Sequence, residues 1–302
     1  MCGIVGLLMK NELLRDRRGE LMAPMFTCMA ARGSDSGGCA FFGKAEKLPL
    51  RRFSLYVCDR QYSWQTLSDA YNSAFGGTNG SRAKLNNLEN HAVLISGDDP
   101  VVVREWLEQR EPEVHLMSIG RSMDVYKDTG DPIEICRRFR FADAVGSHCV
   151  GHTRMATESA VTPIHSHPYT AGEDFCLVHN GSLSNPYMLR RRLERQGIHF
   201  ETDNDTEAAC RFLEWRLREG DDLSAALTTA FAKLDGFYTL LMATGDQICL
   251  ARDAFACKPA VVAETDDYVA ISSEFRSLAH LPGVAEADIF EPKPEEIYSW
   301  RV

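Results

Sequence analysis

The chain has 302 residues, of which 44% are hydrophobic and 25% charged, a composition typical of a globular protein with a sizeable core. Its net charge of −10, from 33 basic and 43 acidic residues, argues against nucleic acid as a partner. No apolar run approaches the roughly 20 residues that span a bilayer, and no signal peptide is evident, so we expect a cytoplasmic protein without a membrane partner.

The first third of the chain alternates short apolar runs with one segment of helical spacing. We predict strands at 2–9, 37–42 and 50–57, and a helix at 18–31 that stops at Arg32-Gly33. Residues 60–145 are less regular, and we interpret about 46–145 as an insertion that carries two βα units. Its predicted strands and helices lie at 91–96, 100–109, 114–119 and 132–139.

The second half is richer in strands. Strands are predicted at 147–154 and 175–179, helices at 185–196, 205–218 and 223–234, and four short strands at 237–243, 247–251, 260–263 and 268–272. Strands with helices before and after them indicate a layered sandwich of sheets and helices.

Ten cysteines are scattered along the chain without a CxxC pair. Zinc-ribbon, redox-motif and iron–sulfur sites therefore have little support, and we expect no metal site and no cofactor in this chain. A chain of this length does not depend on disulfides, so the cysteines favour a reducing compartment.

Cys2 is the first candidate nucleophile. If Met1 is removed, Cys2 carries a thiol and a free α-amine whose ordinary pKa is about 7.7–8.0. That amine can take the thiol proton, which is the chemistry of hydrolases with an N-terminal nucleophile. The alternative is that Cys2 is a small buried hydrophobic residue.

The run His179-Asn180-Gly181-Ser182 lies between an apolar strand and a helix. The Asn180 side-chain amide and the Gly181 N–H could meet at one point and stabilise a tetrahedral oxyanion. The alternative is an ordinary Asn-Gly turn, which is common in hairpins.

Two further segments carry charges that suit the ends of a free amino acid. Arg154 lies at a strand end with Thr157 three residues on, and a guanidinium can bind a carboxylate bidentately. Asp205 lies at a helix start, where it could contact an ammonium group while also capping its helix. Capping alone is the alternative for Asp205.

Taken together, these motifs resemble the class II glutamine amidotransferases, and the resemblance covers about 1–45 and 146–300. It rests on Cys2-Gly-Ile-Val-Gly, Arg32-Gly-Ser-Asp-Ser-Gly37, Gly151-His-Thr-Arg-Met-Ala-Thr157, His179-Asn-Gly181 and Asp203-Asn-Asp-Thr-Glu207, followed by Leu234-Asp-Gly-Phe-Tyr238, Ala251-Arg-Asp253, Lys258-Pro259 and Ser272-Ser-Glu274. It implies an α+β fold, namely a four-layer αββα sandwich of the N-terminal-nucleophile hydrolase type, with the insertion at about 46–145. The whole chain, 1–302, would be one such domain.

The resemblance also implies roles. Cys2 would be the nucleophile with its α-amine as base, Asn180 and Gly181 would form the oxyanion hole, and L-glutamine would be the substrate. Its carboxylate would be bound by Arg154 and its ammonium by Asp205.

Three more residues are assigned to the pocket by the same resemblance. Thr157 would contact substrate or position the Arg154 segment, Arg32 would belong to a loop that shapes the pocket and supports Cys2, and His167 would line the pocket. For His167 an ordinary loop histidine is the alternative.

Within the family, Met155 and Glu158 stand where the hexosamine-forming members carry tryptophan and histidine, which argues against a sugar-phosphate acceptor. The runs from His152 and Asp203 look most similar to free-standing glutaminase subunits of the glutamate-synthase type, including the amidotransferase subunit of N-methylglutamate synthase. That likeness implies a hetero-oligomer in which separate synthase subunits carry FMN and sometimes iron–sulfur clusters. From its position outside the motif-bearing region, we predict that the insertion at 46–145 is the docking surface for that partner. The alternatives are that the insertion is decoration or that it gates the glutamine pocket. A different N-terminal-nucleophile amidohydrolase and a non-catalytic scaffold subunit with the same fold remain alternatives.

Overall fold

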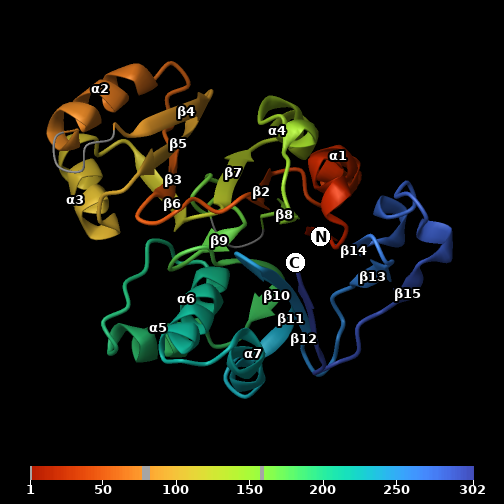
Figure 1. Ribbon diagram of the computed structural model, residues 1–302. Helices are drawn as coiled ribbons and strands as arrows, with labels where there is room; N and C mark the ends of the chain where they lie inside the picture. The colour runs from red at the N-terminus through yellow and green to blue at the C-terminus, as the bar shows by residue number, and fades with distance from the viewer. Residues whose placement is uncertain (1, 77–81, 157–159) are drawn as a thin grey trace.

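The computed structural model describes residues 2–76, 82–156 and 160–302, whose strands form three sheets (Figure 1). The largest sheet contains, in spatial order, β15 (Asp288–Phe290), β13 (Val261–Glu264), β14 (Tyr268–Ser272), β1 (Gly3–Met9), β8 (His148–Arg154), β2 (Ser36–Phe42) and β7 (Met123–Thr129). The second contains β16 (Ile297–Arg301), β12 (Gln247–Arg252), β11 (Gly236–Thr244), β10 (Cys176–Leu183) and β9 (Tyr169–Thr170). Neighbouring strands are antiparallel throughout both sheets.

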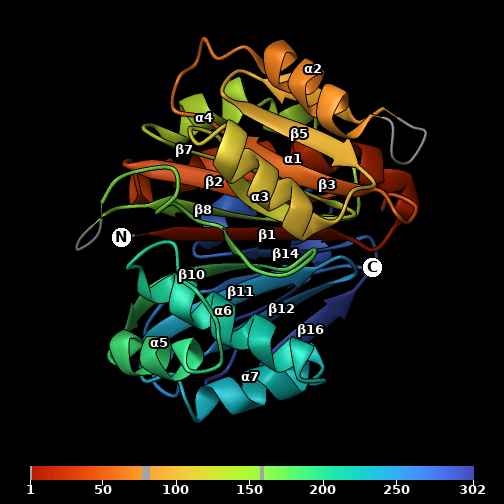
Figure 2. The same cartoon turned by 90° about the vertical axis from the view of Figure 1, so that its left-hand side faces the viewer.

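Helices cover the outer face of each of these two sheets (Figure 2). Helices α1 (Arg18–Cys28) and α4 (Pro132–Arg138) lie on the seven-stranded sheet. Helices α5 (Pro186–Glu194), α6 (Asp205–Arg218) and α7 (Leu223–Phe231) lie on the five-stranded sheet. The two sheets pack face to face, so the expected four-layer αββα sandwich is confirmed.

Strand β1 shows why the sequence folds into these layers. Its side chains alternate between the two faces of the sheet. Val5 and Leu7 pack under the helices on one face, whereas Ile4 and Leu8 face the second sheet and its Leu241. All seven residues of β1 are buried, which explains the continuous apolar run in the sequence.

A third sheet forms a separate layer beside β7, at the upper left of Figure 1. Its elements follow the chain as β3 (Arg51–Tyr56), α2 (Trp64–Phe75), β4 (Lys84–Leu88), β5 (His91–Ser96), α3 (Pro100–Arg110) and β6 (His115–Gly120). The spatial order β4-β5-β3-β6 with antiparallel neighbours is the βαββαβ topology of ferredoxin-like domains. Helices α2 and α3 cover one face and close an apolar core of its own.

This layer is shorter than the expected insertion at 46–145 and differs in its pairing. Strand β7 and helix α4 fall within 46–145 but pack onto the seven-stranded sheet. The expected two βα units are two split units, because each pair of parallel strands is separated by an antiparallel one. The other face of the layer is fastened to β7 by Ser54, whose Oγ accepts from Val125 N at 3.0 Å.

Several element ends differ from the sequence prediction. The helix expected at 18–31 is α-helical only to Cys28 and continues as a 3₁₀ turn over Met29–Arg32. Further 3₁₀ turns lie at Glu12–Arg17, Phe141–Asp143, Phe275–Ser277 and Val284–Glu286. The strand expected at 175–179 extends to Leu183, because residues 180–183 pair with 236–239. Among the helices of the described residues, none is long and apolar enough to cross a membrane.

Candidate active site

Cys2 lies at the start of β1, beside the end of β8. The register pairs Gly3 with Thr153, so Cys2 comes next to Arg154 and Met155. The half-buried Cys2 thiol donates to the Met155 carbonyl with an Sγ···O distance of 3.7 Å. Strand pairing therefore brings the predicted nucleophile to the segment that carries the predicted carboxylate-binding arginine.

Two predicted site residues hold the main chain of Cys2. The Cys2 carbonyl accepts from Arg32 Nε at 2.9 Å and from Asn180 Nδ2 at 3.1 Å. Arg32 is itself fixed by an ion pair between Nη1 and Glu274 Oε1 at 2.6 Å. That guanidinium lowers the pKa of the Glu274 carboxyl, chiefly through the hydrogen bond.

Asn180 and Gly181 lie inside β10, so the alternative of an Asn-Gly turn is wrong. The second contact of Asn180 Nδ2 is Ser273 Oγ at 3.1 Å, and the same hydroxyl accepts from Ile4 N at 2.9 Å. Gly181 has a φ of +145°, and a Cβ there would lie 1.8 Å from the Phe237 carbonyl oxygen. The backbone at this point of the strand therefore requires glycine.

Arg154 is buried at the end of β8 and donates from Nη1 to the Ala160 carbonyl at 2.9 Å. The chain that follows Arg154 is held by Asp35, whose Oδ2 accepts from Ala156 N at 2.8 Å. The segment Arg32–Gly37 thus contacts both Cys2 and the Arg154 segment. Thr157, the other predicted residue here, lies outside the described residues.

Asp205 begins α6, but it does not cap that helix as expected. Asn204 is the N-cap, because its side-chain oxygen accepts from Thr206 N at 2.8 Å. Asp205 Oδ2 instead accepts from Leu183 N at 2.8 Å. A side chain one residue past the cap points back along the helix start, which places this carboxylate beside the end of β10.

His167 is buried behind these groups. Its ring stacks on His152 with centroids 4.0 Å apart, and its Nε2 lies 3.0 Å from Thr206 Oγ1. His179 Nδ1 lies 3.0 Å from the same hydroxyl. Burial lowers the pKa of His152 to about 3 and also lowers the pKa of His167 and His179, so three neutral imidazoles support the start of α6.

Comparison with known proteins identifies the family of this chain. A family model described as "Glutamine amidotransferase domain" matches residues 152–280. The glutamine amidotransferase-like protein GlxB of Rhizobium meliloti (strain 1021) is 43% identical over 301 residues, which cover 99% of this chain and 98% of that protein. The chain belongs to the class II glutamine amidotransferase family.

Other members of the family match in part. The glutamine–fructose-6-phosphate aminotransferase of Shewanella oneidensis is 36% identical over 146 residues, which cover 48% of this chain and 23% of that protein. The solved glutamine phosphoribosylpyrophosphate amidotransferase from B. subtilis superposes with a TM-score of 0.61 at 16% identity, covering 99% of this chain and 49% of that one. At that identity the superposition supports the fold alone, and this amidotransferase chain spans about half the length of that solved chain.

Sequence reasoning missed three residues that the site uses. Ser273 accepts from Asn180, Glu274 pairs with Arg32, and Thr206 joins His167 to His179. Ser273 and Glu274 stand in a motif that resembles the family, but their roles depend on β14 pairing with β1. Among the described residues, no group of three His, Cys, Asp or Glu side chains is arranged to hold a metal ion.

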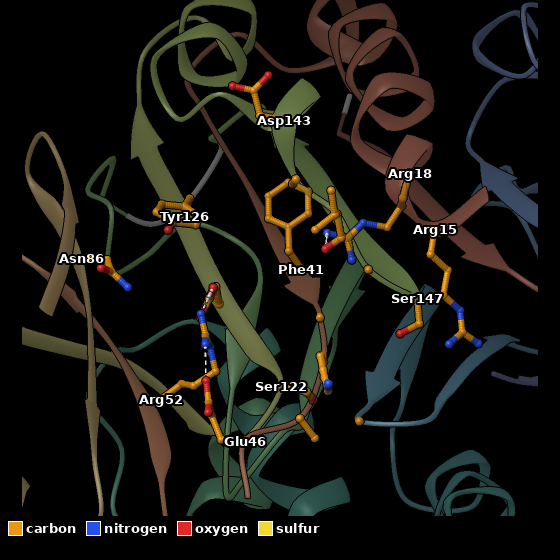
Figure 3. Close-up of a pocket in the computed structure, with 18 of the residues that line it drawn as sticks. Arg15, Arg18, Phe41, Glu46, Arg52, Asn86, Ser122, Tyr126, Asp143 and Ser147 are labelled. Atoms are coloured by element: carbon orange, nitrogen blue, oxygen red, sulfur yellow. Dashed lines mark hydrogen bonds and ion pairs between the residues drawn. The ribbon is translucent and has the colours of Figure 1, made fainter. Parts of the chain in front are cut away.

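A large cavity of about 1420 Å³ lies elsewhere, between the third sheet and the sandwich. Arg52 in this cavity points toward Glu46 (Figure 3), and its Nη1 lies 2.9 Å from Glu46 Oε1. Its Nη2 lies 2.7 Å from Asp124 Oδ2. Ser147 lines the same cavity and accepts from Met9 N, at the end of β1 opposite to Cys2. This cavity is therefore separate from the amidotransferase site.

Proposed function

We propose that this chain is a glutaminase that converts L-glutamine to L-glutamate and ammonia through a thioester on Cys2. The observation that carries the proposal is the contact of Cys2 with Asn180 and with the Arg154 segment, at one end of the two sheets. Removal of Met1 exposes an α-amine, which takes the Cys2 thiol proton. The thiolate then attacks the carboxamide carbon of glutamine.

The tetrahedral oxygen that forms is stabilised by the Asn180 side-chain amide and the Gly181 N–H. Asn180 Nδ2 exchanges its contact with Ser273 for this oxygen, since one of its two hydrogens stays on the Cys2 carbonyl. Collapse of the intermediate breaks the C–N bond, and the α-ammonium of Cys2 protonates the departing amide nitrogen, which leaves as ammonia. Water then hydrolyses the γ-glutamyl thioester and regenerates the thiol.

Recognition of glutamine uses both of its charged ends. Arg154 binds the carboxylate and Asp205 binds the ammonium. Thr157 contacts the substrate or positions the Arg154 segment. Arg32 supports the Cys2 carbonyl through the contacts described above, so its part in substrate binding is indirect. His167 acts in the same indirect way, through Thr206.

The test combines the mass of the mature N-terminus with a covalent label. A diazoketone analogue of glutamine should alkylate Cys2 in the wild-type protein, and Cys2→Ala should abolish both labelling and glutamine turnover while the melting temperature stays the same. Turnover that survives Cys2→Ala contradicts the proposal. A retained Met1 in an active protein contradicts the role of the α-amine, and labelling without glutamine turnover would favour another amidohydrolase or a scaffold subunit.

We further propose that the ammonia is used by a separate synthase subunit of the glutamate-synthase or N-methylglutamate-synthase type, which would carry FMN and possibly iron–sulfur clusters. A cytoplasmic hetero-oligomer would then form through the insertion. The support is that the third sheet lies outside the αββα sandwich and exposes apolar side chains such as Val101, which is 62% exposed on α3. Co-purification from the native source, with the subunits identified, tests this proposal.

A matched pair of variants sharpens that test. Val101→Glu should weaken co-purification, whereas Leu13→Glu, on the 3₁₀ turn outside the insertion and 88% exposed, should leave it unchanged. Equal recovery of partner subunits with both variants would contradict docking through this helix.

A further inference from the structure

Lys127 is a buried lysine on β7 that the proposed chemistry does not use. Its side chain is 4% exposed, and β7 is the edge strand of the seven-stranded sheet next to the third sheet. Burying an ammonium group is costly unless its donors are satisfied. The contacts of the Lys127 ammonium group therefore indicate its role.

Its acceptors all come from one short loop. Lys127 Nζ donates to the carbonyls of Ser166 at 2.9 Å, Pro168 at 3.1 Å and Ile164 at 3.4 Å. An ammonium group has three donors, so the three carbonyls match them one to one. Nζ also lies 5.1 Å from the centre of the Tyr169 ring, a favourable position for a cation over an aromatic face.

The backbone opposite is shaped to allow this contact. Gly38 pairs with Lys127 across β2 and β7. A Cβ at Gly38 would lie 2.3 Å from Lys127 Cβ and 2.4 Å from the His167 carbonyl oxygen. A larger residue would push the lysine side chain and the loop away from the sheet. The close packing of Lys127 and the loop against β2 therefore requires glycine at position 38.

The same loop supports both charged groups proposed for glutamine. Arg154 donates to the Ala160 carbonyl at the start of the loop, and His167 within it contacts Thr206, the neighbour of Asp205. The ends of the loop are therefore tied to the carboxylate-binding arginine and the ammonium-binding aspartate. Lys127 holds the second half of the loop, from Ile164 to Pro168.

We propose that Lys127 is a positioning residue of the glutamine pocket, which fixes loop 160–168 so that Arg154 and Asp205 keep the spacing of the two charged ends of an α-amino acid. This role rests on the glutaminase function proposed above. It predicts a defect in glutamine affinity rather than in the reactivity of Cys2, because the lysine contacts neither the thiol nor Asn180.

The state of the group at neutral pH fits this role. Burial lowers the pKa of Lys127 to about 8, while the carboxylates of Glu201 and Glu207 favour the charged form. The neighbouring His167 is a neutral imidazole, because burial lowers its pKa and the charges of Arg154 and Lys127 lower it further. Lys127 is therefore mostly protonated at pH 7 and can supply all three donors.

The main test is Lys127→Met, which keeps the length of the side chain and removes its donors. We expect the KM for glutamine to rise about tenfold or more, the cost of weakening one charge-assisted contact. The rate of Cys2 alkylation by iodoacetamide should stay within about twofold, since the thiol is not touched. Lys10→Met is the matched control, because Lys10 also bonds a carbonyl, that of Thr265, but at the far end of β1.

A second variant gives a readout that simple loss of packing would not produce. Lys127 lines a pocket of about 430 Å³ between the third sheet and α6, so Lys127→Ala opens a path from that pocket to the three carbonyls. Added n-butylammonium should lower the raised KM of Lys127→Ala, whereas n-butanol should not. If Lys127→Met does not fold, Lys127→Gln, which keeps one donor, replaces it in the same comparison.

The outcomes separate the two proposals. An active wild type together with a folded Lys127→Met of unchanged KM overturns the role of Lys127 alone. Alkylation that slows as much as turnover, or an equal effect of Lys10→Met, also overturns it. A wild-type protein with an exposed Cys2 that hydrolyses no glutamine overturns the glutaminase function instead.

Discussion

Arg32 and Glu274 form an ion pair with an Nη1···Oε1 distance of 2.6 Å, and the same guanidinium donates to the carbonyl of Cys2. The two residues are 242 positions apart in the chain, and β14 brings them together by pairing with β1. The main chain of the proposed nucleophile is thus held by a charged pair whose members come from the segment after α1 and the end of β14.

Glu274→Gln should lower kcat/KM several-fold, because a neutral amide holds Arg32, and through it Cys2, less firmly. Glu173→Gln, which breaks the Arg51 pair of the same length, should leave kcat/KM unchanged in steady-state assays.

The same ion pair should make stability depend on pH, because the pKa of Glu274 is lower in the folded protein than in the unfolded chain. Its contribution to the free energy of unfolding is present above the unfolded pKa, near 4.5, and is lost as the pH falls through the folded pKa. That contribution should be at most about 1 kcal/mol, since the side chain is partly exposed.

Asn180→Ala should lower kcat about 10²–10³-fold, the usual loss when one oxyanion donor is removed. Ser273→Ala should cost much less activity, because it removes a competing contact of the Asn180 amide and leaves the oxyanion donor in place. Its remaining cost comes from the Ile4 N–H, which loses its acceptor. Single-turnover measurements of thioester formation would compare the two variants. Similar losses in both would mean that Asn180 acts by supporting β1 and not by binding the oxyanion.

Gly181→Ala should lower the free energy of unfolding by about 2–4 kcal/mol, because it combines a positive φ with a collision at the Phe237 carbonyl. Gly197→Ala is the control: its φ is +77°, but a Cβ there meets nothing within 4 Å. The control should cost about 1 kcal/mol. Urea titrations that gave equal losses would exclude the close contact as the cause.

Acid should destabilise this protein through its buried histidines. Burial lowers the pKa of His91, His148 and His152 to about 3, whereas the ordinary value is 6.5. Between these values the unfolded chain binds more protons, so the free energy of unfolding falls as the pH drops below 6.5. Each such group contributes a slope of up to about 1.4 kcal/mol per pH unit.

Urea unfolding between pH 5.5 and 7.5 measures that slope, in a range above the titration of ordinary carboxylates. His148→Gln, far from the proposed site, should reduce the slope by one group even if it lowers stability overall. His115→Gln, at an exposed position, should leave the slope as it is. A stability that did not change with pH in this range would show that these rings are protonated or exposed in solution.

The order of motifs along the chain was enough to predict the family and the αββα sandwich. The long apolar run of β1 and the spacing of α6 follow from local sequence, because side-chain period and helix caps are local properties. The third sheet was harder to predict. Its helix α2 and strand β4 belong to split units whose partners are separated along the chain, and β4 is a largely exposed edge strand without a clear alternation.

The sequence by itself determined which residue types carry the proposed chemistry: a cysteine at position 2, an arginine at a strand end and an Asn-Gly pair. Only the tertiary structure decided what surrounds them. Strand pairing brings Ser273 and Glu274 beside Cys2, and it buries Lys127 against the loop at 160–168. Neither strand pairing nor burial can be read from local spacing. The physical reason is that sheet register and the satisfaction of buried donors depend on the whole fold, whereas periodicity and capping depend on a few neighbouring residues.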